Sequence, residues 1–215
     1  MSSTIFIFFM SSFLLITYSH VASHVHDFCV ADITGPQSPA GYSCKDISKV
    51  TVDDFVYTGL SVRSNTSNIF KFGFAAAAAP LLPGLNGLGV SIGRADLEIG
   101  GVVPIHSHPG ANELVIIVEG SSIIGGFIDS KNTVYQKILK KGDVMVLPQG
   151  LYHFFVNNGK SPAVIYASFS SETPTVQTLD TLLFSNNLDT DIIANTTRLG
   201  RAQIRELKKL FHGTN

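Results

Sequence analysis

The chain has 215 residues, of which 45% are hydrophobic and 14% are charged. This composition excludes a disordered or coiled-coil chain and predicts one globular unit, residues 24–215, with a substantial core. The formal net charge of −1 gives no electrostatic reason to expect binding to nucleic acid or to an anionic membrane.

Residues 1–23 have the organisation of a secretory signal peptide. The apolar run from Ile5 to Ile16 is too short to span a bilayer comfortably, and Val21 and Ser23 suit the small-residue rule for cleavage. The residues before the run include no Lys or Arg, which is atypical. We expect cleavage after Ser23 and secretion without a membrane anchor; an uncleaved anchor is the alternative.

The N-terminal segment, residues 24–74, carries both cysteines, Cys29 and Cys44. An even cysteine count in a secreted chain predicts a disulfide, which would pin this segment to the rest of the fold. Two free buried thiols are the alternative. The motifs Asn65-Thr-Ser67 and Asn195-Thr-Thr197 are N-glycosylation sequons, so we expect glycans at Asn65 and Asn195 on a secreted chain.

Short β-prone runs separated by turn residues fill residues 75–171, which we take as the barrel core. The predicted strands are Leu88–Leu97, Val102–His108, Glu113–Val118, Ser122–Ile128, Thr133–Leu139, Asp143–Leu147, Leu151–Asn157 and Ala163–Phe169. Many short strands at regular spacing predict an all-β sandwich or barrel. The low-complexity run Ala75–Ala79 precedes Pro80 and is interpreted as a loop or a strand end.

Residues 172–215 form a C-terminal segment with helical periodicity. Thr190–Ala194 and Arg201–Phe211 are the predicted helices, the second with Ile204 and Leu207 on its apolar face. Basic residues are concentrated here: Arg198, Arg201, Arg205, Lys208 and Lys209. We interpret them as a solvated helix face rather than a membrane-binding one.

Three histidines and a glutamate in two short blocks predict a metal centre. In a strand His106 and His108 share a face, and the break at Pro109-Gly110 allows Glu113 to turn towards them. His153 lies on a separate predicted strand. Imidazole and carboxylate ligands without thiolate suit Mn, Fe, Ni or Zn. The alternative is a set of ordinary histidines satisfied by hydrogen bonds.

The blocks from Gly100 to Gly120 and from Gly142 to Asn157 match both germin boxes of the cupin superfamily. The chain therefore resembles the germin-like proteins, and it is most similar to the subgroup once named auxin-binding proteins of plant cell walls. The resemblance implies a cupin jelly-roll β-barrel with C-terminal α-helices. It also implies Mn(II) on His106, His108, Glu113 and His153, a homohexamer built as a trimer of dimers, and location in the apoplast or cell wall.

The resemblance leaves three functions open. Many germin-like proteins are credited with superoxide dismutase activity, and we expect this activity here, together with a role in plant defence. The cereal germins oxidise oxalate and carry two asparagines beside the metal, but the matching residues here are Gly93 and Val103. Because neither side chain can hydrogen-bond a carboxylate, we expect no useful oxalate oxidase activity. The third function is non-enzymatic: a cell-wall or storage protein, or a binder of a small ligand such as auxin.

Overall fold

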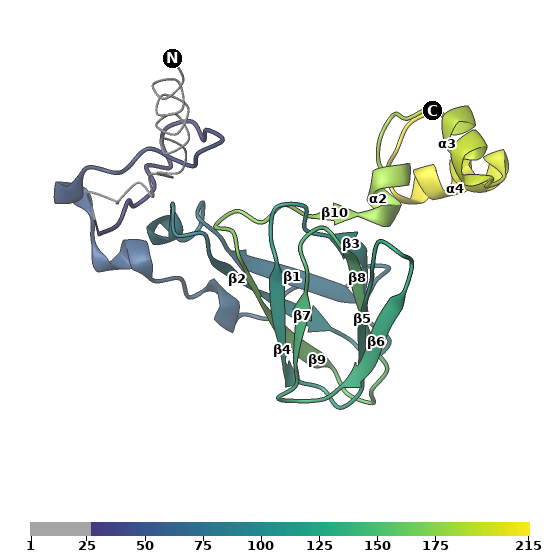
Figure 1. The fold of residues 1–215 in the computed structure, drawn as a ribbon, viewed down its shortest axis with the longest axis horizontal. Helices are drawn as coiled ribbons and strands as arrows, with labels where there is room; N and C mark the ends of the chain where they lie inside the picture. Colours follow the sequence, from purple (N-terminus) through teal and green to yellow (C-terminus); the bar gives the residue numbers. More distant parts are fainter. Residues whose placement is uncertain (1–26) are drawn as a thin grey trace, which may run out of the picture.

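The computed structural model describes residues 27–215, which fold around two five-stranded antiparallel sheets (Figure 1). One sheet has the order β1-β2-β9-β4-β7 and the other the order β10-β3-β8-β5-β6. The strands are β1 (Phe72–Ala77), β2 (Ser91–Leu97), β3 (Val102–Ser107), β4 (Glu113–Glu119), β5 (Ile123–Ile128), β6 (Val134–Leu139), β7 (Val144–Leu147), β8 (Tyr152–Asn157), β9 (Ala163–Phe169) and β10 (Gln177–Thr178). The predicted all-β architecture is confirmed.

The main core lies between the two sheets and follows the period-two pattern of the strands. In β4, Val115 and Ile117 are buried while Leu114 and Ile116 point outwards and are exposed. Side chains from both sheets, including Leu97, Leu147 and Phe155, join the same buried cluster. Burial of this apolar surface is the main force that holds the sheets face to face.

Each of the eight predicted strands is present, with small shifts at the ends. The largest shift is in β2, which begins at Ser91 rather than Leu88 because Gly87 and Gly89 have positive φ angles of 75° and 66° and form a turn. β1 was missed. It contains part of the alanine run and crosses the predicted boundary between residues 74 and 75. Alanine is a weak strand former, and pairing with β2 along the whole strand decides its conformation.

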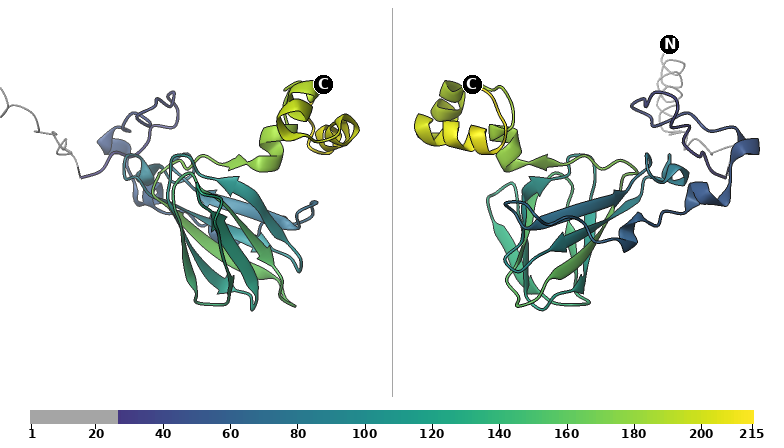
Figure 2. Two further views of the ribbon diagram at one scale, coloured as in Figure 1. Left: turned by 45° about the vertical axis from the view of Figure 1, so that its right-hand side comes forward. Right: turned by 180° about the vertical axis from the view of Figure 1, so that it is seen from behind.

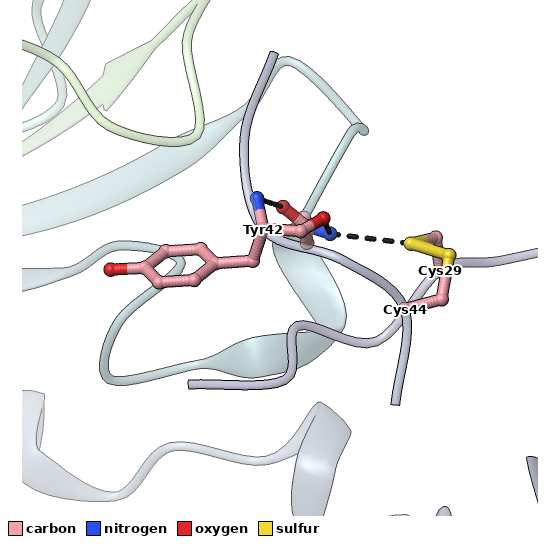
Figure 3. Close-up of a disulfide and its surroundings, with 4 residues drawn as sticks. Cys29, Tyr42 and Cys44 are labelled. Atoms are coloured by element: carbon pink, nitrogen blue, oxygen red, sulfur yellow. Dashed lines mark hydrogen bonds between the residues drawn. A yellow bond between two sulfur atoms is a disulfide. The ribbon is translucent and has the colours of Figure 1, made fainter. Parts of the chain in front are cut away.

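The N-terminal segment is irregular, with short 3₁₀ turns at Ile47–Lys49, Val52–Phe55 and Gly59–Ser61, and a fourth, Pro83–Leu85, follows β1. The expected disulfide joins Cys29 and Cys44. Figure 3 shows the disulfide with Tyr42 near it. The buried Asn86 side-chain amide donates to the Tyr42 carbonyl and contacts the Cys29 sulfur. The Asn86 Oδ1 atom accepts from the Tyr42 N–H. The expectation that the disulfide pins this segment to the rest of the fold is wrong, because both cysteines lie within the segment and the bridge closes a loop of it. The Asn86 amide, which follows β1, is the group that fastens the loop to the body. The predicted signal peptide lies outside the described residues.

Three helices form a separate small unit after β10: α2 (Leu179–Phe184), α3 (Thr190–Thr197) and α4 (Arg201–Leu210). α2 was not predicted, whereas α3 and α4 match the two predicted helices. Figure 2 shows the unit projecting beyond one end of the barrel. Its core consists of Phe184, Ile193, Ala194 and Ile204. No helix in residues 27–215 is long and apolar enough to cross a membrane.

The prediction that the C-terminal basic residues form a solvated face is correct for four of them and wrong for Lys208. Arg198, Arg201, Arg205 and Lys209 are exposed. Lys208 is only 2% exposed, and its ammonium donates to the carbonyls of Asn186, Leu188 and Thr214. Three backbone acceptors replace the water that a charged amine would otherwise need.

Candidate metal centre

Three strands bring the four predicted ligands together. His106 lies on β3 opposite His153 on β8, in a region where a register irregularity follows Val103. His108 follows the end of β3, and Glu113 opens β4. The tight turn between them is closed by a bond from the Ala111 N–H to the His108 carbonyl. The turn therefore presents Glu113 towards the histidines.

Hydrogen bonds between the two sequence blocks fix this turn. The Gly150 N–H donates to the His108 carbonyl at 3.0 Å. The Gln149 side chain donates to the Pro109 carbonyl at 2.7 Å. Asn157 is the last residue of the second block. Its side-chain amide donates to the carbonyls of Glu98 and Ser161, away from the four predicted ligands. Gln149 therefore holds the turn beside the candidate ligands, whereas Asn157 does not contact it.

The four side chains form a compact, buried cluster. One nitrogen or oxygen atom from each of His106, His108, Glu113 and His153 lies within 4.8 Å of the others. The Glu113 Oε2 atom is 2.9 Å from the His153 Nε2 atom and 3.4 Å from the His108 Nε2 atom. No one of the four side chains is more than about a tenth exposed. Separations of this size can be bridged by one ion.

Backbone carbonyls orient all three imidazoles. The Nδ1 atoms of His106, His108 and His153 lie 2.8, 2.6 and 2.8 Å from the carbonyl oxygens of Pro104, Thr175 and Leu151. Only a protonated Nδ1 can form these bonds, so in a neutral ring the Nε2 atom carries the lone pair. The lone pairs needed to bind a metal are thereby set by the backbone.

This arrangement leaves two buried atoms without a partner. Within the described residues, Glu113 Oε2 and His153 Nε2 are the buried side-chain atoms without a hydrogen bond. A lone pair on the imidazole and a negative oxygen repel each other at 2.9 Å. A cation between them would satisfy both, whereas histidines with a purely structural role would have both nitrogens paired. The residues present therefore fit a metal ion.

The pKa shifts show that the centre favours positive charge near the carboxylate and resists it on His106. Burial alone would raise the pKa of Glu113, but hydrogen bonds that the His108 and His153 imidazoles can donate once protonated outweigh burial and lower it to about 2. Burial, reinforced by His153, lowers the pKa of His106 to about 4. At neutral pH the carboxylate is ionised and His106 is neutral, which are the forms that bind metal.

A cavity of 640 Å³ opens directly onto this cluster. Its inner wall is apolar and includes Phe72, Phe74, Ala95, Val103, Phe155 and Phe169. Its polar residues include Gln37 and threonines of the segment between β9 and α2, such as Thr175. The cavity offers a small molecule a route to the centre through a largely hydrophobic space.

Sequence reasoning missed the carbonyl of Thr175 and the ring of Phe74. A backbone carbonyl has no residue signature, and Thr175 is 67 residues from His108 in the chain. Phe74 belongs to the missed strand β1, and its ring lies over Gly93 on β2. Gly93 and Val103 were both expected beside the centre; Val103 lines the cavity, and the space next to Gly93 is filled by Phe74.

The fold and the four-residue centre together define a cupin with a site able to hold a metal. The cupin family model matches residues 58–205. Auxin-binding protein ABP19a of Prunus persica is 54% identical over 211 residues, which is 98% of this chain and all of that protein. Germin-like protein subfamily 3 member 3 of Arabidopsis thaliana is 49% identical over the whole of both chains. The chain therefore belongs to the germin-like proteins of the cupin family.

A solved structure supports the same assignment. Oxalate oxidase in complex with the substrate analogue glycolate is 32% identical, with a TM-score of 0.83. The match covers 87% of this chain and 96% of the oxalate oxidase chain. The barrel and most of the segments around it thus share one architecture with that oxalate oxidase.

Proposed function

We propose that this chain is a secreted, manganese-binding germin-like glycoprotein that dismutes superoxide. The observation that carries the proposal is the buried pair formed by Glu113 Oε2 and His153 Nε2, which needs a cation between its atoms. His106, His108, Glu113 and His153 would hold the ion. Three imidazoles and a carboxylate suit several divalent metals, and the germin resemblance selects Mn(II).

Bound manganese would supply one-electron transfer in both directions: one superoxide is oxidised to O₂, and a second takes up that electron and two protons to give H₂O₂. The chain's own residues prepare the site. The carbonyls of Pro104, Leu151 and Thr175 keep the three rings oriented, and the ionised Glu113 balances part of the metal charge. The cavity admits a small anion, and burial of the four side chains limits contact of the centre with bulk solvent.

Oxalate oxidation is not part of the proposal. A dicarboxylate needs hydrogen-bond donors beside the metal, and Gly93 and Val103 stand where the oxalate-oxidising germins have asparagines. Val103 is 8% exposed and contributes to the apolar wall. Robust release of H₂O₂ from oxalate by the Mn-loaded protein would contradict this part of the proposal.

Secretion is supported by the sequence of residues 1–23, by the Cys29–Cys44 disulfide and by the two sequons. Asn65 and Asn195 are both exposed, so a glycan could be attached at either without burying it. We place the mature chain, residues 24–215, in the apoplast or cell wall. N-terminal sequencing and glycosidase treatment of protein secreted from plant cells would test both processing steps.

A homohexamer, arranged as a trimer of dimers, is supported by an apolar patch on the outer face of the barrel. Leu114, Ile116, Val144 and Val146 are 47%, 42%, 54% and 59% exposed. They lie side by side on the paired strands β4 and β7. A contiguous apolar face of this kind is typical of a surface covered by another subunit.

The first experiment is metal analysis with EPR on protein secreted from a eukaryotic host, followed by a superoxide dismutase assay on the same sample. We expect near-stoichiometric Mn and dismutase activity, both lost in the His153→Ala variant. His212→Asn is the matched control, because His212 is exposed and lies outside the cluster. Stoichiometric zinc, or manganese without dismutase activity, would overturn the redox function.

The second candidate is a non-enzymatic role as a wall or storage protein that binds a small ligand. The apolar cavity beside the centre favours it, and three relatives bear the name auxin-binding protein. An auxin carboxylate could reach the metal while its ring fills the cavity. Calorimetric titration with auxin tests this role: saturable binding that His153→Ala removes would support it, and no heat change would exclude it.

A further inference from the structure

The ring of Phe74 occupies the space that a side chain at position 93 would need. In the pairing of β1 with β2, Phe74 lies opposite Ala95 and Ala76 lies opposite Gly93, so Phe74 and Gly93 are diagonal neighbours on one face. A Cβ atom at Gly93 would lie only 2.2 Å from the Phe74 Cζ atom. A side chain at 93 and the present position of the Phe74 ring therefore exclude each other.

The same ring belongs to a series of aromatic side chains that reaches the centre. Its centroid is 6.5 Å from that of Phe72 and 6.4 Å from that of Phe169, and the Phe169 ring lies 4.8 Å from His108. All of these residues line the cavity. Phe74 is 46% exposed, so part of its ring is free to contact a ligand.

The aromatic wall formed by Phe72, Phe74 and Phe169 determines which class of ligand the cavity can bind tightly. Beside it, Ala95 and Val103 extend the apolar surface towards His106. A short dicarboxylate would have to place its second charge against hydrocarbon, which costs free energy because the charge loses its water. A flat apolar group instead gains from stacking on aromatic rings and from leaving water.

We propose that Phe74 is the specificity-determining residue of the cavity. By filling the space beside Gly93 it completes an aromatic wall, and this wall selects a ligand with a flat apolar body and a single carboxylate. The apolar body packs against Phe74 and Phe169, and the carboxylate faces the metal centre. The inference rests on the proposed function, because Glu113 would repel the carboxylate unless a metal ion is bound.

The test uses calorimetric titration of the Mn-loaded protein with naphthalene-2-carboxylate and with oxalate. We expect the wild-type protein to bind naphthalene-2-carboxylate at least about tenfold more tightly than oxalate, and Phe74→Ala to weaken that binding by about tenfold. Phe74→Leu, which keeps an apolar side chain but removes the aromatic face, should give a smaller loss. Ile138→Ala is the control, since Ile138 is 61% exposed on β6 and does not line the cavity.

Gly93→Asn provides an independent arm. The new side chain must displace the Phe74 ring, so we expect weaker naphthalene-2-carboxylate binding and stronger oxalate binding, and the double variant with Phe74→Ala should show non-additive effects. Thermal melts of every variant establish that it is folded. Binding of naphthalene-2-carboxylate that is unchanged within twofold in both Phe74 variants would overturn the inference, as would equal affinity of the wild-type protein for oxalate.

Metal content measured on the same samples separates the two proposals. Stoichiometric Mn with no binding of naphthalene-2-carboxylate refutes the role of Phe74 and leaves the proposed metal function intact. If the protein takes up no Mn, the proposed function fails, and the aromatic wall is then tested with the uncharged naphthalene-2-methanol. Binding of that alcohol that Phe74→Ala weakens supports the wall, and its absence refutes it.

Discussion

Glu113 is the residue on which the centre depends most, because its carboxylate faces two imidazole nitrogens in a buried space. The negative charge attracts a cation, but in the metal-free protein it faces the lone pair of His153. The Glu113 side chain therefore favours metal binding and lowers the stability of the metal-free protein. The two effects can be separated by a substitution that keeps shape and removes charge.

Glu113→Gln should weaken metal binding and leave the metal-free protein at least as stable. The amide has no negative charge for the ion, so we expect the metal affinity to fall by more than about 100-fold. Its N–H can donate to His153 Nε2, which removes an unpaired buried group. Competitive chelator titration measures the affinity, and thermal melting of the metal-free protein measures the stability. A lower melting temperature without loss of metal affinity would contradict the argument.

Glu119→Gln is the matched control for that experiment. Glu119 lies at the other end of the same strand and is exposed. It should change neither quantity, because an exposed carboxylate away from the centre contributes little to either.

The stability of the metal-free protein should fall as the pH is lowered from about 6.5 to about 4. The pKa of His106 is about 4 in the folded protein against an ordinary value of 6.5. The unfolded chain therefore binds more protons across this range, and the folded state loses up to roughly 3 kcal/mol.

Urea unfolding of the metal-free protein at pH 7 and pH 4.5 measures this loss of stability. His106→Asn should flatten the dependence between the two pH values, because asparagine does not titrate. The same slope in wild type and variant would show that other groups cause it.

The ligand set could be predicted at the residue scale because its members are few and chemically distinct. His106, His108 and Glu113 lie within one short block, and the break at Pro109 explains how the glutamate turns inwards. The pairing of Phe74 with Gly93 could not be predicted in the same way. It depends on the register of two strands, and one of them has an alanine-rich sequence that carries almost no strand signal.

At the scale of elements, the C-terminal unit depends on a buried charge. α4 carries Lys208 into the interior of the unit, where its ammonium joins the α2–α3 connection to the C-terminal residues through three carbonyls. Helical periodicity shows that Lys208 lies beside the apolar face of the helix, but it does not show which groups face the side chain. The burial arises from the way the chain end wraps back over the helix.

Lys208→Met should therefore destabilise the unit by roughly 2–3 kcal/mol, because the partly buried carbonyls of Leu188 and Thr214 lose their charged donor and Asn186 keeps only the Thr214 N–H. We expect amide hydrogen exchange to become faster across α3 and α4 while the barrel strands stay protected. Lys209→Met, an exposed neighbour, should change stability by less than about 0.5 kcal/mol. Unchanged exchange in the Lys208 variant would show that the three bonds contribute little to the stability of the unit.

At the scale of the whole molecule, the barrel was predictable from strand spacing, but the apolar patch proposed as a subunit contact was not. Leu114 and Val115 are equally apolar in the sequence, yet one faces outwards and the other is buried. Only the pairing of β4 with β7 places Leu114 next to Val146 and so creates a patch. The patch is where a test of assembly is most informative.

Replacing Leu114 and Val146 together by lysine should dissociate the proposed hexamer. Two charges would be buried against an apolar partner surface, and the desolvation cost would exceed what the contact gains. Because both side chains point away from the core, the barrel should remain folded and should still bind metal. Light scattering coupled to size exclusion measures the mass, and Val62→Lys, at a position that is 67% exposed, is the control. A hexamer that survives the double substitution would place the subunit contact on another face of the barrel.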